Sequence, residues 1–273
     1  MAEITVIYHG NCFDGTAAAW VASKFLVGKI NYVPCAYGDP VPAKPLYENK
    51  HVYVIDFSFP RNVMEEMAKL ANSLTVIDHH KTAQAACEGL PYCTFDMNRS
   101  GAGLTWDILS EGKPRPVLID YIEDRDLWKF ALPESAAVHV WIASYSKDIS
   151  IYDWLSSMLT DYFEQCVSEG KAILRFKDQK VEELAADATL GFINGYEVPI
   201  VNCPYQFGSD VAHRLTELYP DKPFAAYFLY DKNGNLRFGL RGKDTDDFDV
   251  SEVAKKMGGG GHKKAAGYEI KLK

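Results

Sequence analysis

The sequence contains no uninterrupted apolar run that approaches the length of about 20 residues needed for a membrane-spanning helix. Its first ten residues, MAEITVIYHG, lack the basic and long apolar regions of a secretory signal. The six cysteines include no CxxC pair, and cysteines scattered in this way are typical of reduced thiols. We therefore expect a cytoplasmic protein that does not associate with membranes.

The chain also lacks an excess of positive charge, because 37 acidic residues outnumber 29 Lys and Arg and give a formal net charge of −8. Proteins that hold long duplex nucleic acid normally present a basic face, so this balance argues against such a role. Short anionic substrates remain compatible with it, because bound divalent cations would reverse the local field of a carboxylate-rich pocket. With 273 residues, 47% of them hydrophobic and 24% charged, the chain is typical of a globular protein with one large or two ordinary domains.

Three short apolar segments predict β-strands, at residues 4–8, 51–55 and 74–77. A glycine-containing turn and an Ala-rich helix from about Thr16 follow the first strand, and a predicted helix over 61–71 follows the second. Apolar strands that alternate with helices predict a parallel sheet with helices on its faces. The fold class we expect is therefore α/β.

The predicted strands end in side chains that can bind metals. Parallel strands have their carboxyl ends at one edge of the sheet, where ligands bind in α/β proteins. Several carboxylates gathered there would repel one another unless a cation lay between them, and imidazole with carboxylate suits Mn, Co, Mg or Zn. We expect a metal centre rather than a salt-bridged structural cluster, formed by His9, Asp14, Asp56, Asp78, His79 and His80.

A further acidic segment, VLIDYIEDRDLWKF at 117–130, has ambiguous secondary structure. It contains Asp120, Glu123, Asp124 and Asp126. By composition alone, the pattern favours the solvated end of an amphipathic helix, without a function.

Several segments together resemble the DHH phosphoesterase superfamily. VIDHHKTA at 76–83 resembles its Asp-His-His signature, YHGNCFDGTAAAW at 8–20 its first motif, VIDFSF at 54–59 its second and YIEDRDLW at 121–128 its fourth. NRSGAGLTWDIL at 98–109 resembles the segment that opens a helix before the fourth motif. GGGGHKKAAG at 258–267 resembles the glycine-rich signature of the associated DHHA1 domain, and RFGLRG at 237–242 its arginine strand. The two signatures in this order are specific.

The resemblance implies hydrolysis of phosphoester bonds with two divalent ions, commonly Mn2+, with Mg2+ or Co2+ as alternatives. It implies that one ion is bound by Asp14, Asp56, His79 and Asp124. Asp56 would bridge to a second ion that also takes His9. Asp126 is an alternative to Asp124, because the spacing of the loop is not fixed by the sequence.

The same resemblance implies catalytic roles for His80, which would face the substrate phosphate, and for Asp56, which would hold the attacking water. Asp78 would orient the neighbouring histidine rings. The sequence departs from the family in the first motif, where Asn11 or Cys12 stands in place of an acidic residue. This departure puts the second ion in question, unless Asn11 supplies a neutral carbonyl oxygen.

We expect a DHH catalytic domain over 1–145, a helical connector over 146–192 and a smaller α/β DHHA1 domain over 193–273, with the active site between the domains. EGK at 169–171 predicts a break in the connector, and 243–249 predicts a loop that caps a helix over 250–257. Glycines allow backbone amides to approach a phosphate, and arginine suits bidentate phosphate binding. The substrate-binding residues implied by the resemblance are Arg241, Gly259, Gly260, Gly261, His262 and Lys263.

The function that the resemblance implies is that of a metal-dependent phosphodiesterase of short oligonucleotides or dinucleotides, similar to nano-RNases and exonucleases. The acidic pI, near 5.4, and the short chain favour a short substrate. Alternatives within the family are a 3′-phosphoadenosine 5′-phosphate phosphatase and a cyclic nucleotide phosphodiesterase. A non-catalytic nucleotide sensor is an alternative of another class, supported by the missing acidic residue. Cleavage polarity and oligomeric state, a homodimer included, are left open.

Overall fold

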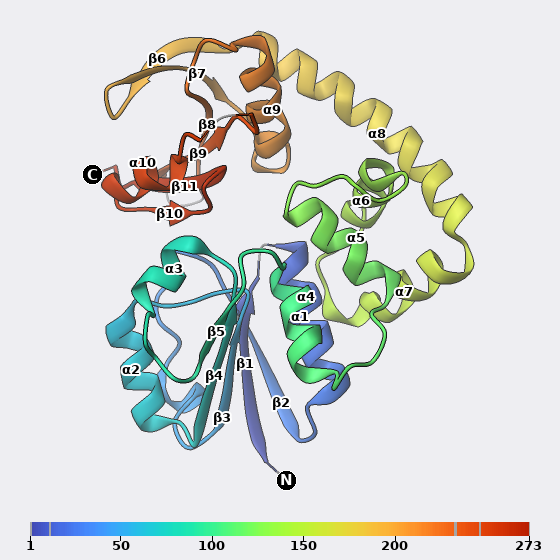
Figure 1. The fold of residues 1–273 in the computed structure, drawn as a ribbon, viewed down its shortest axis with the longest axis vertical. Coiled ribbons are helices and arrows are strands. Elements are labelled where there is room, and N and C mark those ends of the chain that lie inside the picture. The colour runs from blue at the N-terminus through green and yellow to red at the C-terminus, as the bar shows by residue number, and fades with distance from the viewer. Residues whose placement is uncertain (1, 11, 232–233, 246, 273) are drawn as a thin grey trace. The chain divides into compact units, whose positions relative to one another are not determined.

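The computed structural model describes residues 2–10, 12–231, 234–245 and 247–272. The chain divides into two compact units, residues 1–174 and 175–273, and each is built on its own sheet. Figure 1 shows both sheets with their helices. Among the described helices, none is both long and apolar enough to cross a bilayer.

The sheet of the first unit has five strands in the order β2-β1-β3-β4-β5, and every neighbouring pair is parallel. This arrangement confirms the predicted α/β class. The two strands at the edges of the sheet were not predicted, because their burial is incomplete and their sequences are less apolar. The strands are β1 (Glu3–His9), β2 (Lys29–Cys35), β3 (His51–Ile55), β4 (Ser73–Asp78) and β5 (Cys93–Phe95).

The strand order reverses at β1, and this reversal determines where a ligand can bind. The chain passes from β1 to β2 on one side and then returns to β3 on the other side of β1. Tyr8 pairs with Ile55, and Ile55 pairs with Ile77, so the carboxyl ends of β1, β3 and β4 are adjacent. Parallel sheets bind ligands beyond such a switch point.

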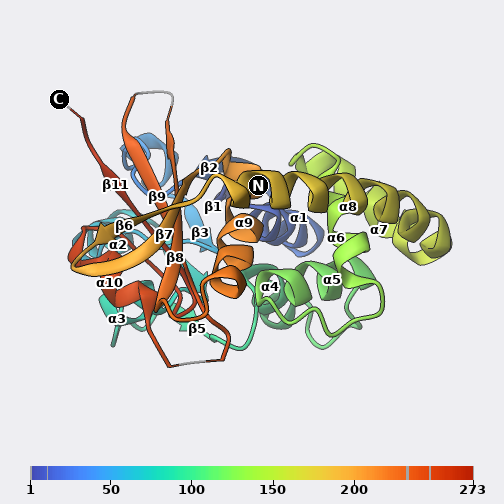
Figure 2. The same cartoon turned by 90° about the horizontal axis from the view of Figure 1, so that it is seen from above.

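Helices cover both faces of this sheet. In Figure 1, α1 (Phe13–Phe25) and α4 (Gly101–Leu109) lie on one side, and α2 (Arg61–Leu70) and α3 (Lys81–Ala86) lie on the other. Helices α5 (Val117–Asp126), α6 (Ser135–Ala143) and α7 (Tyr152–Asp161) gather beside α1 and α4, as Figure 2 also shows. They enlarge the core on that side, in which Trp20, Trp141 and Tyr152 are buried. Short 3-10 turns occupy Lys44–Leu46 and Ile149–Ile151.

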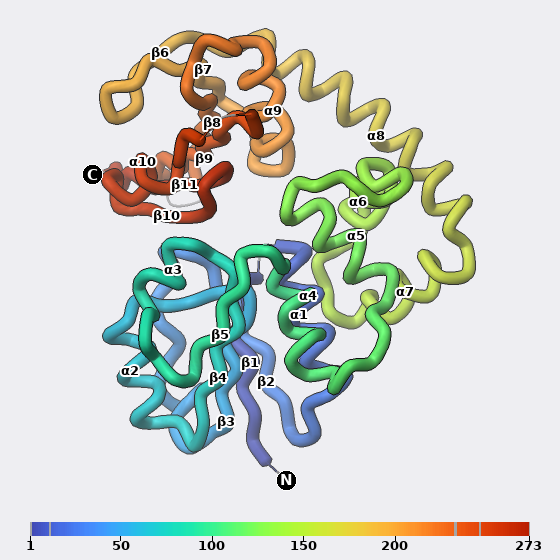
Figure 3. Tube along the Cα trace, viewed as in Figure 1, coloured from blue at the N-terminus to red at the C-terminus, as the bar shows by residue number. Residues whose placement is uncertain are grey.

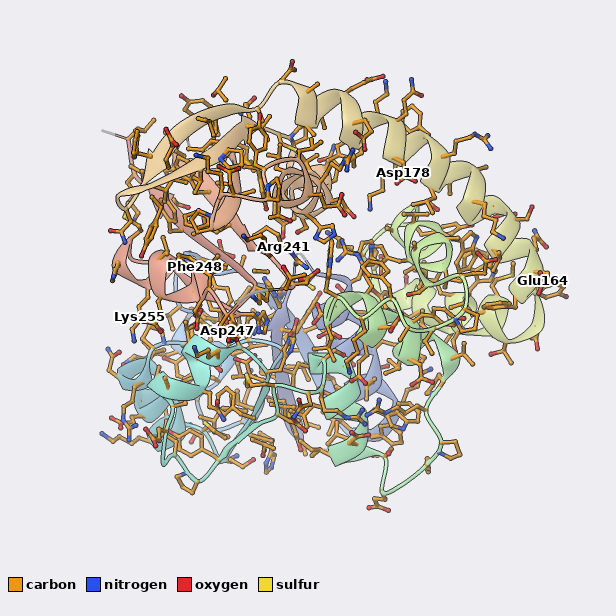
Figure 4. All side chains as sticks on the ribbon, turned by 45° about the horizontal axis from the view of Figure 1, so that its top comes forward. Glu164, Asp178, Arg241, Asp247, Phe248 and Lys255 are labelled. Carbon is orange, nitrogen blue, oxygen red and sulfur yellow. The ribbon has the colours of Figure 1, made fainter. Side chains whose placement is uncertain are left out.

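A single helix, α8 (Phe163–Ala186), runs through the boundary between the units. The predicted break at 169–171 was wrong, because the helix is continuous, as the tube in Figure 3 shows. Figure 4 labels Glu164 near its start and Asp178 farther along it. Gly170 is present for packing: a Cβ there would overlap the backbone of Ala137 in α6.

The second unit contains a six-stranded mixed sheet in the order β10-β11-β9-β8-β7-β6, with α9 (Tyr205–Leu218) and α10 (Val250–Lys256). Only β7 and β8 pair in parallel among its described strands. Asp249 caps α10 by accepting the Ser251 amide at 3.0 Å, as predicted. The strands are β6 (Thr189–Ile193), β7 (Tyr196–Asn202), β8 (Phe224–Tyr230), β9 (Leu236–Gly242), β10 (Gly260–Gly261) and β11 (Ala265–Ile270).

Candidate metal centre

The ends of β1, β3 and β4 bring imidazoles and a carboxylate together around Asp56. Nε2 of His79 lies 3.1 Å from Oδ1 of Asp56, and Nδ1 of His9 lies 3.6 Å from Oδ2. Asp56 is 1% exposed, yet neither of its oxygens accepts a hydrogen bond with proper geometry from the described residues. A buried carboxylate without such partners is unfavourable, so this arrangement suits the binding of a cation.

The backbone at Asp56 has an unusual conformation that two glycines accommodate. Its φ is +53°, in the left-handed region that few residues other than glycine, asparagine and aspartate adopt. A Cβ at Gly15 would lie 2.9 Å from Oδ2 of Asp56, and one at Gly101 would lie 2.6 Å from Oδ1. The glycines of the first motif and of the α4 start therefore leave the space in which this carboxylate lies. Strained residues of this kind cluster at functional sites.

Asp14 joins the cluster from the first turn of α1. Its Oδ2 and Oδ1 accept the amides of Gly101 and Ala102 at 2.5 and 3.0 Å, at the N-terminus of α4. That terminus favours an anion because its amides point outward and the helix dipole is positive there. Oδ2 of Asp14 is also 3.8 Å from Nε2 of His79.

Glu123 holds the start of α4 in place. Its Oε2 accepts the Ser100 amide at 3.0 Å, and its Oε1 accepts from Arg99 and Arg115 at 2.9 and 3.1 Å. A Cβ at Gly103 would overlap Oε2 of Glu123, so a glycine is required there too. This acidic residue of the fourth motif therefore positions the amides that Asp14 uses.

The carboxylates of the cluster differ in their electrostatics. Although burial opposes it, His79 and His9 lower the pKa of Asp56. Burial, together with the charges of Asp56 and Asp126, raises the pKa of Asp14 well above its usual range. Burial and the charge of Asp56 also raise the pKa of Asp126, although His79 opposes this. Burial would lower the pKa of His79, but the surrounding carboxylates raise it well above its usual range. A divalent cation would relieve the repulsion and keep the carboxylates ionised.

The donor set fits divalent cations at two overlapping positions. One ligand atom each from Asp14, Asp56 and His79 lies within 4.8 Å of the others, and so do ligand atoms of His9, Cys12 and Asp56. Asp56 belongs to both groups, and also to a third group with Asp78 and His80. A set of imidazole and carboxylate donors suits Mn, Co and Zn better than it suits Mg, which prefers oxygen ligands alone. Asn11, expected beside the second position, lies outside the described residues.

Asp124 and Asp126 have different surroundings in the structure. The resemblance implies Asp124 as the ligand, with Asp126 as the alternative. Oδ1 of Asp124 accepts the Ala131 amide at 2.9 Å, and its Oδ2 accepts the Ser135 hydroxyl at 2.5 Å. Its carboxylate is thus used to hold the loop between α5 and α6. Oδ2 of Asp126 lies 3.5 Å from Nε2 of His79. Asp126 therefore lies beside the cluster, whereas the oxygens of Asp124 are used by the loop, and we propose Asp126 as the ligand in place of Asp124.

Asp78 positions the two histidines that follow it. Its Oδ1 lies 2.7 Å from Nδ1 of His80 and accepts the His79 amide at 2.7 Å, while its Oδ2 accepts from Ser58 at 2.7 Å. Burial would lower the pKa of His80, but the charge and hydrogen bond of Asp78 raise it. The oxygens of Asp78 are occupied in this way, which agrees with an orienting role rather than metal ligation.

Tyr37 lies beside the centre and was not predicted from the sequence. The residue is 46% exposed, although burial raises the pKa of its hydroxyl well above the usual range. Its ring meets the rings of His9 and His80 edge-on, with centroids 5.7 and 5.6 Å apart. The ring of Phe57 packs against the Tyr37 ring, with the two centroids 4.7 Å apart. Nothing in the segment AYGDP distinguishes this tyrosine from an ordinary loop residue.

The predicted substrate residues of the second unit lie on β9 and around β10. Arg241, labelled in Figure 4, is buried on β9, with Nη2 3.8 Å from Asp244. A Cβ at Gly259 would overlap Gly267, so this glycine permits close packing against β11. The Gly259 amide donates to Ala254 at 2.8 Å.

Two more amides of the glycine-rich segment are also used within the chain, those of Gly258 and His262. These contacts do not favour phosphate binding through the backbone of this segment. Gly260 and Gly261 pair with β11 as the short strand β10, and Lys263 contacts Asp247 at 2.9 Å. The side chains of His262 and Lys263 remain a proposal for substrate binding.

The fold and the geometry define an α/β protein with a candidate two-cation centre at the carboxyl edge of a parallel sheet. Residues 209–273 match the DHHA1 domain family. The uncharacterized protein R106 of Acanthamoeba polyphaga mimivirus is 27% identical over 278 residues, covering 96% of this chain and 66% of the relative. Oligoribonuclease NrnB of Bacillus subtilis strain 168 is 26% identical over 231 residues, covering 76% of this chain and 55% of the relative. The chain thus spans about half to two thirds of these relatives' lengths.

Solved structures agree in fold. A DHH domain described as a member of the s1p family of ribosomal proteins superposes with a TM-score of 0.55, at 11% identity, over 97% of this chain and 82% of that one. The pGpG-specific phosphodiesterase PggH of Vibrio cholerae gives 0.50 at 14% identity, over 100% of this chain and 94% of that one. Together these findings confirm the resemblance to the DHH/DHHA1 superfamily.

Proposed function

We propose that this protein is a divalent-cation-dependent phosphodiesterase that hydrolyses short oligonucleotides or dinucleotides. The observation that carries the proposal is the gathering of three carboxylates around Nε2 of His79, from which oxygens of Asp14, Asp56 and Asp126 lie 3.8, 3.1 and 3.5 Å away. Similarity to an oligoribonuclease and to a pGpG-specific phosphodiesterase supports a short nucleotide substrate.

Cations bound here would lower the pKa of a coordinated water and neutralise charge on the phosphoryl oxygens. The chain's own residues have separate tasks. Asp56 belongs to both candidate ligand groups and would hold a cation in either of them, and its left-handed backbone conformation sets the position of its carboxylate. His80, oriented through Nδ1 by Asp78, is placed to donate a hydrogen bond to a phosphoryl oxygen as charge develops on it. We infer Mn2+ as the working ion because the resemblance to DHH phosphoesterases implies it and the imidazole and carboxylate donors are compatible with it.

We propose that Tyr37 stacks on a base of the substrate. Its exposed ring lies beside both His9 and His80, so a phosphate bound near these histidines would place a neighbouring base within reach. Stacking of this kind contributes about 1–3 kcal/mol per base and tolerates different bases. Replacing Tyr37 with Leu should therefore raise KM for a dinucleotide more than it lowers kcat.

The test is a comparison of four substrates under the same Mn2+ concentration. A labelled RNA dinucleotide, a cyclic dinucleotide, 3′-phosphoadenosine 5′-phosphate and pyrophosphate are each incubated with wild type and with Asp56→Asn. We expect the dinucleotide to be cleaved fastest, and only by the wild type. Preference for another phosphoester would reassign the substrate, and tight dinucleotide binding without product would identify a sensor instead.

A further inference from the structure

Cys12 differs from the other cysteines of the chain in its surroundings. Cys35, Cys87, Cys93, Cys166 and Cys203 are each part of, or packed against, a hydrophobic core. Cys12 is half-buried and belongs to none of the hydrophobic clusters formed by the described residues. Apolar packing therefore does not explain a cysteine at this position.

A role in helix capping does not explain it either. Cys12 occupies the N-cap of α1, where serine, threonine, aspartate and asparagine are preferred because their oxygens accept the first amides. Its side chain makes no capping hydrogen bond. The residue thus occupies a position where a different side chain would stabilise the helix better.

The sulfur of Cys12 lies instead within a set of ligand atoms. It is within 4.8 Å of a ring nitrogen of His9 and of a carboxylate oxygen of Asp56. Asp56 is 1% exposed, and its oxygens have no hydrogen-bond partner among the described residues. Nδ1 of His9 also lacks one. Sulfur, nitrogen and oxygen donors therefore lie close together at a buried carboxylate, as the ligands of a cation do.

We propose that Cys12 supplies a thiolate ligand to the second cation position, together with His9 and Asp56. The thiol proton is released to solvent when the sulfur binds the cation. A thiolate is a soft ligand, whereas Mg2+ prefers oxygen ligands, so this position favours Zn2+ or Co2+ over Mg2+. The inference rests on the proposed metal centre but not on its phosphodiesterase activity.

The test is a titration of the metal-free full chain with Co2+, followed by absorption spectroscopy. A cysteine ligand gives a thiolate-to-cobalt charge-transfer band in the near ultraviolet, which oxygen and nitrogen ligands do not give. We expect the band in the wild type, its loss in Cys12→Ser and its retention in Cys93→Ser. Cys93 is the matched control because it has the same intermediate exposure in the same unit.

A second variant, Cys12→Asp, tests the selectivity and places at the N-cap a residue that favours the helix. Calorimetry should show that Cys12→Asp binds Mg2+ about tenfold more tightly than the wild type does. A change of this size in metal affinity is common when the residues around a metal site are altered. The charge-transfer band should be absent. A band that persists in Cys12→Ser, or is missing from the wild type, overturns the inference.

The dinucleotide assay separates this result from the proposed function. Mn2+-dependent cleavage by a wild type without the band would reject the cysteine ligand and keep the phosphodiesterase. The band in a wild type that cleaves none of the four substrates would keep the ligand and reject the phosphodiesterase.

Discussion

Asp124 and Asp126 lie two residues apart at the end of α5, and their carboxylates serve different neighbours. Oδ1 of Asp124 accepts the amide of Ala131 at 2.9 Å, whereas Oδ2 of Asp126 lies 3.5 Å from Nε2 of His79. The first contact connects α5 to the following loop, and the second connects it to the candidate centre. The two residues can therefore be separated by experiment.

Asp124→Asn should lower the free energy of unfolding, because an amide cannot accept all the donors that now contact the carboxylate. We expect a loss of about 1–3 kcal/mol, the scale for buried donors left without a partner. Asp126→Asn should instead stabilise the metal-free protein and reduce the thermal shift produced by Mn2+. Denaturant unfolding with and without Mn2+ measures both effects. The reverse pattern would restore Asp124 as the ligand.

Asp56→Asn should abolish the rise in Tm that Mn2+ produces. It should also lower turnover by more than about 100-fold, the upper end of the effect of removing a residue that only orients a metal ligand. The fold should persist, because asparagine also adopts the left-handed backbone that this position requires. Asp221→Asn, at a side chain 71% exposed in the second unit, is the control. Undiminished Mn2+ stabilisation in Asp56→Asn would remove the bridging role.

Gly101→Ala should displace the Asp56 carboxylate, because the added Cβ would lie 2.6 Å from its Oδ1. Gly15→Ala should displace both His9 and Asp56, because its Cβ would overlap the His9 backbone oxygen and lie 2.9 Å from Oδ2 of Asp56. We expect destabilisation of about 1–3 kcal/mol, as for other overpacked sites, together with weaker Mn2+ binding. In Gly191→Ala, the added Cβ meets only the end of the Ile200 side chain in the second unit, at 2.9 Å. Calorimetry should find Mn2+ binding unchanged in that control, and an equal loss there would show that the effect is not local.

Cation binding should release protons and strengthen as the pH rises. In the metal-free protein, burial and neighbouring carboxylates raise the pKa of Asp14 and of Asp126. A carboxyl group whose pKa is higher in the folded state than in the unfolded state destabilises the folded state once it must ionise. This loss of stability develops as the pH rises from the unfolded-state pKa to the folded-state pKa. The metal-free protein should lose stability over that window, and Mn2+ should restore it. Titration calorimetry in two buffers of different ionisation enthalpy counts the released protons, and Asp126→Asn should release fewer.

Asp78→Asn should lower the pKa of His80, because burial alone lowers it and the Asp78 carboxylate raises it. Turnover should fall by about 10–100-fold, while the Mn2+ affinity changes less, since Asp78 is assigned to orientation. An NMR titration of the His80 ring gives its pKa directly. An unchanged pKa together with lost Mn2+ binding would make Asp78 a ligand.

The sequence predicted the parts of the site that follow from strand topology. Strands at 4–8, 51–55 and 74–77 end in polar residues, and a parallel sheet brings those ends together whatever the loops do. His9, Asp56 and His79 were therefore found correctly as neighbours. The start of α4 was also predictable, because Ser100 is a typical N-cap.

Other features depend on geometry that the sequence does not carry. Both Asp124 and Asp126 are acidic residues at the end of one helix, and only the rotation of that helix decides which of them reaches His79. Gly170 looked like a helix break but permits close packing, since the identity of the neighbouring helix cannot be inferred from a local pattern. Tyr37 became significant only once its loop was seen beside the histidines.

The carboxylates of Asp14, Asp56 and Asp126 come from α1, from the end of β3 and from the end of α5, so the centre joins segments that are distant in the chain. An ion that binds only the folded chain shifts the folding equilibrium by mass action. In a cell starved of transition metals, we therefore expect proteases to remove a larger share of this protein. Its steady-state amount would then follow the metal supply, independently of transcription.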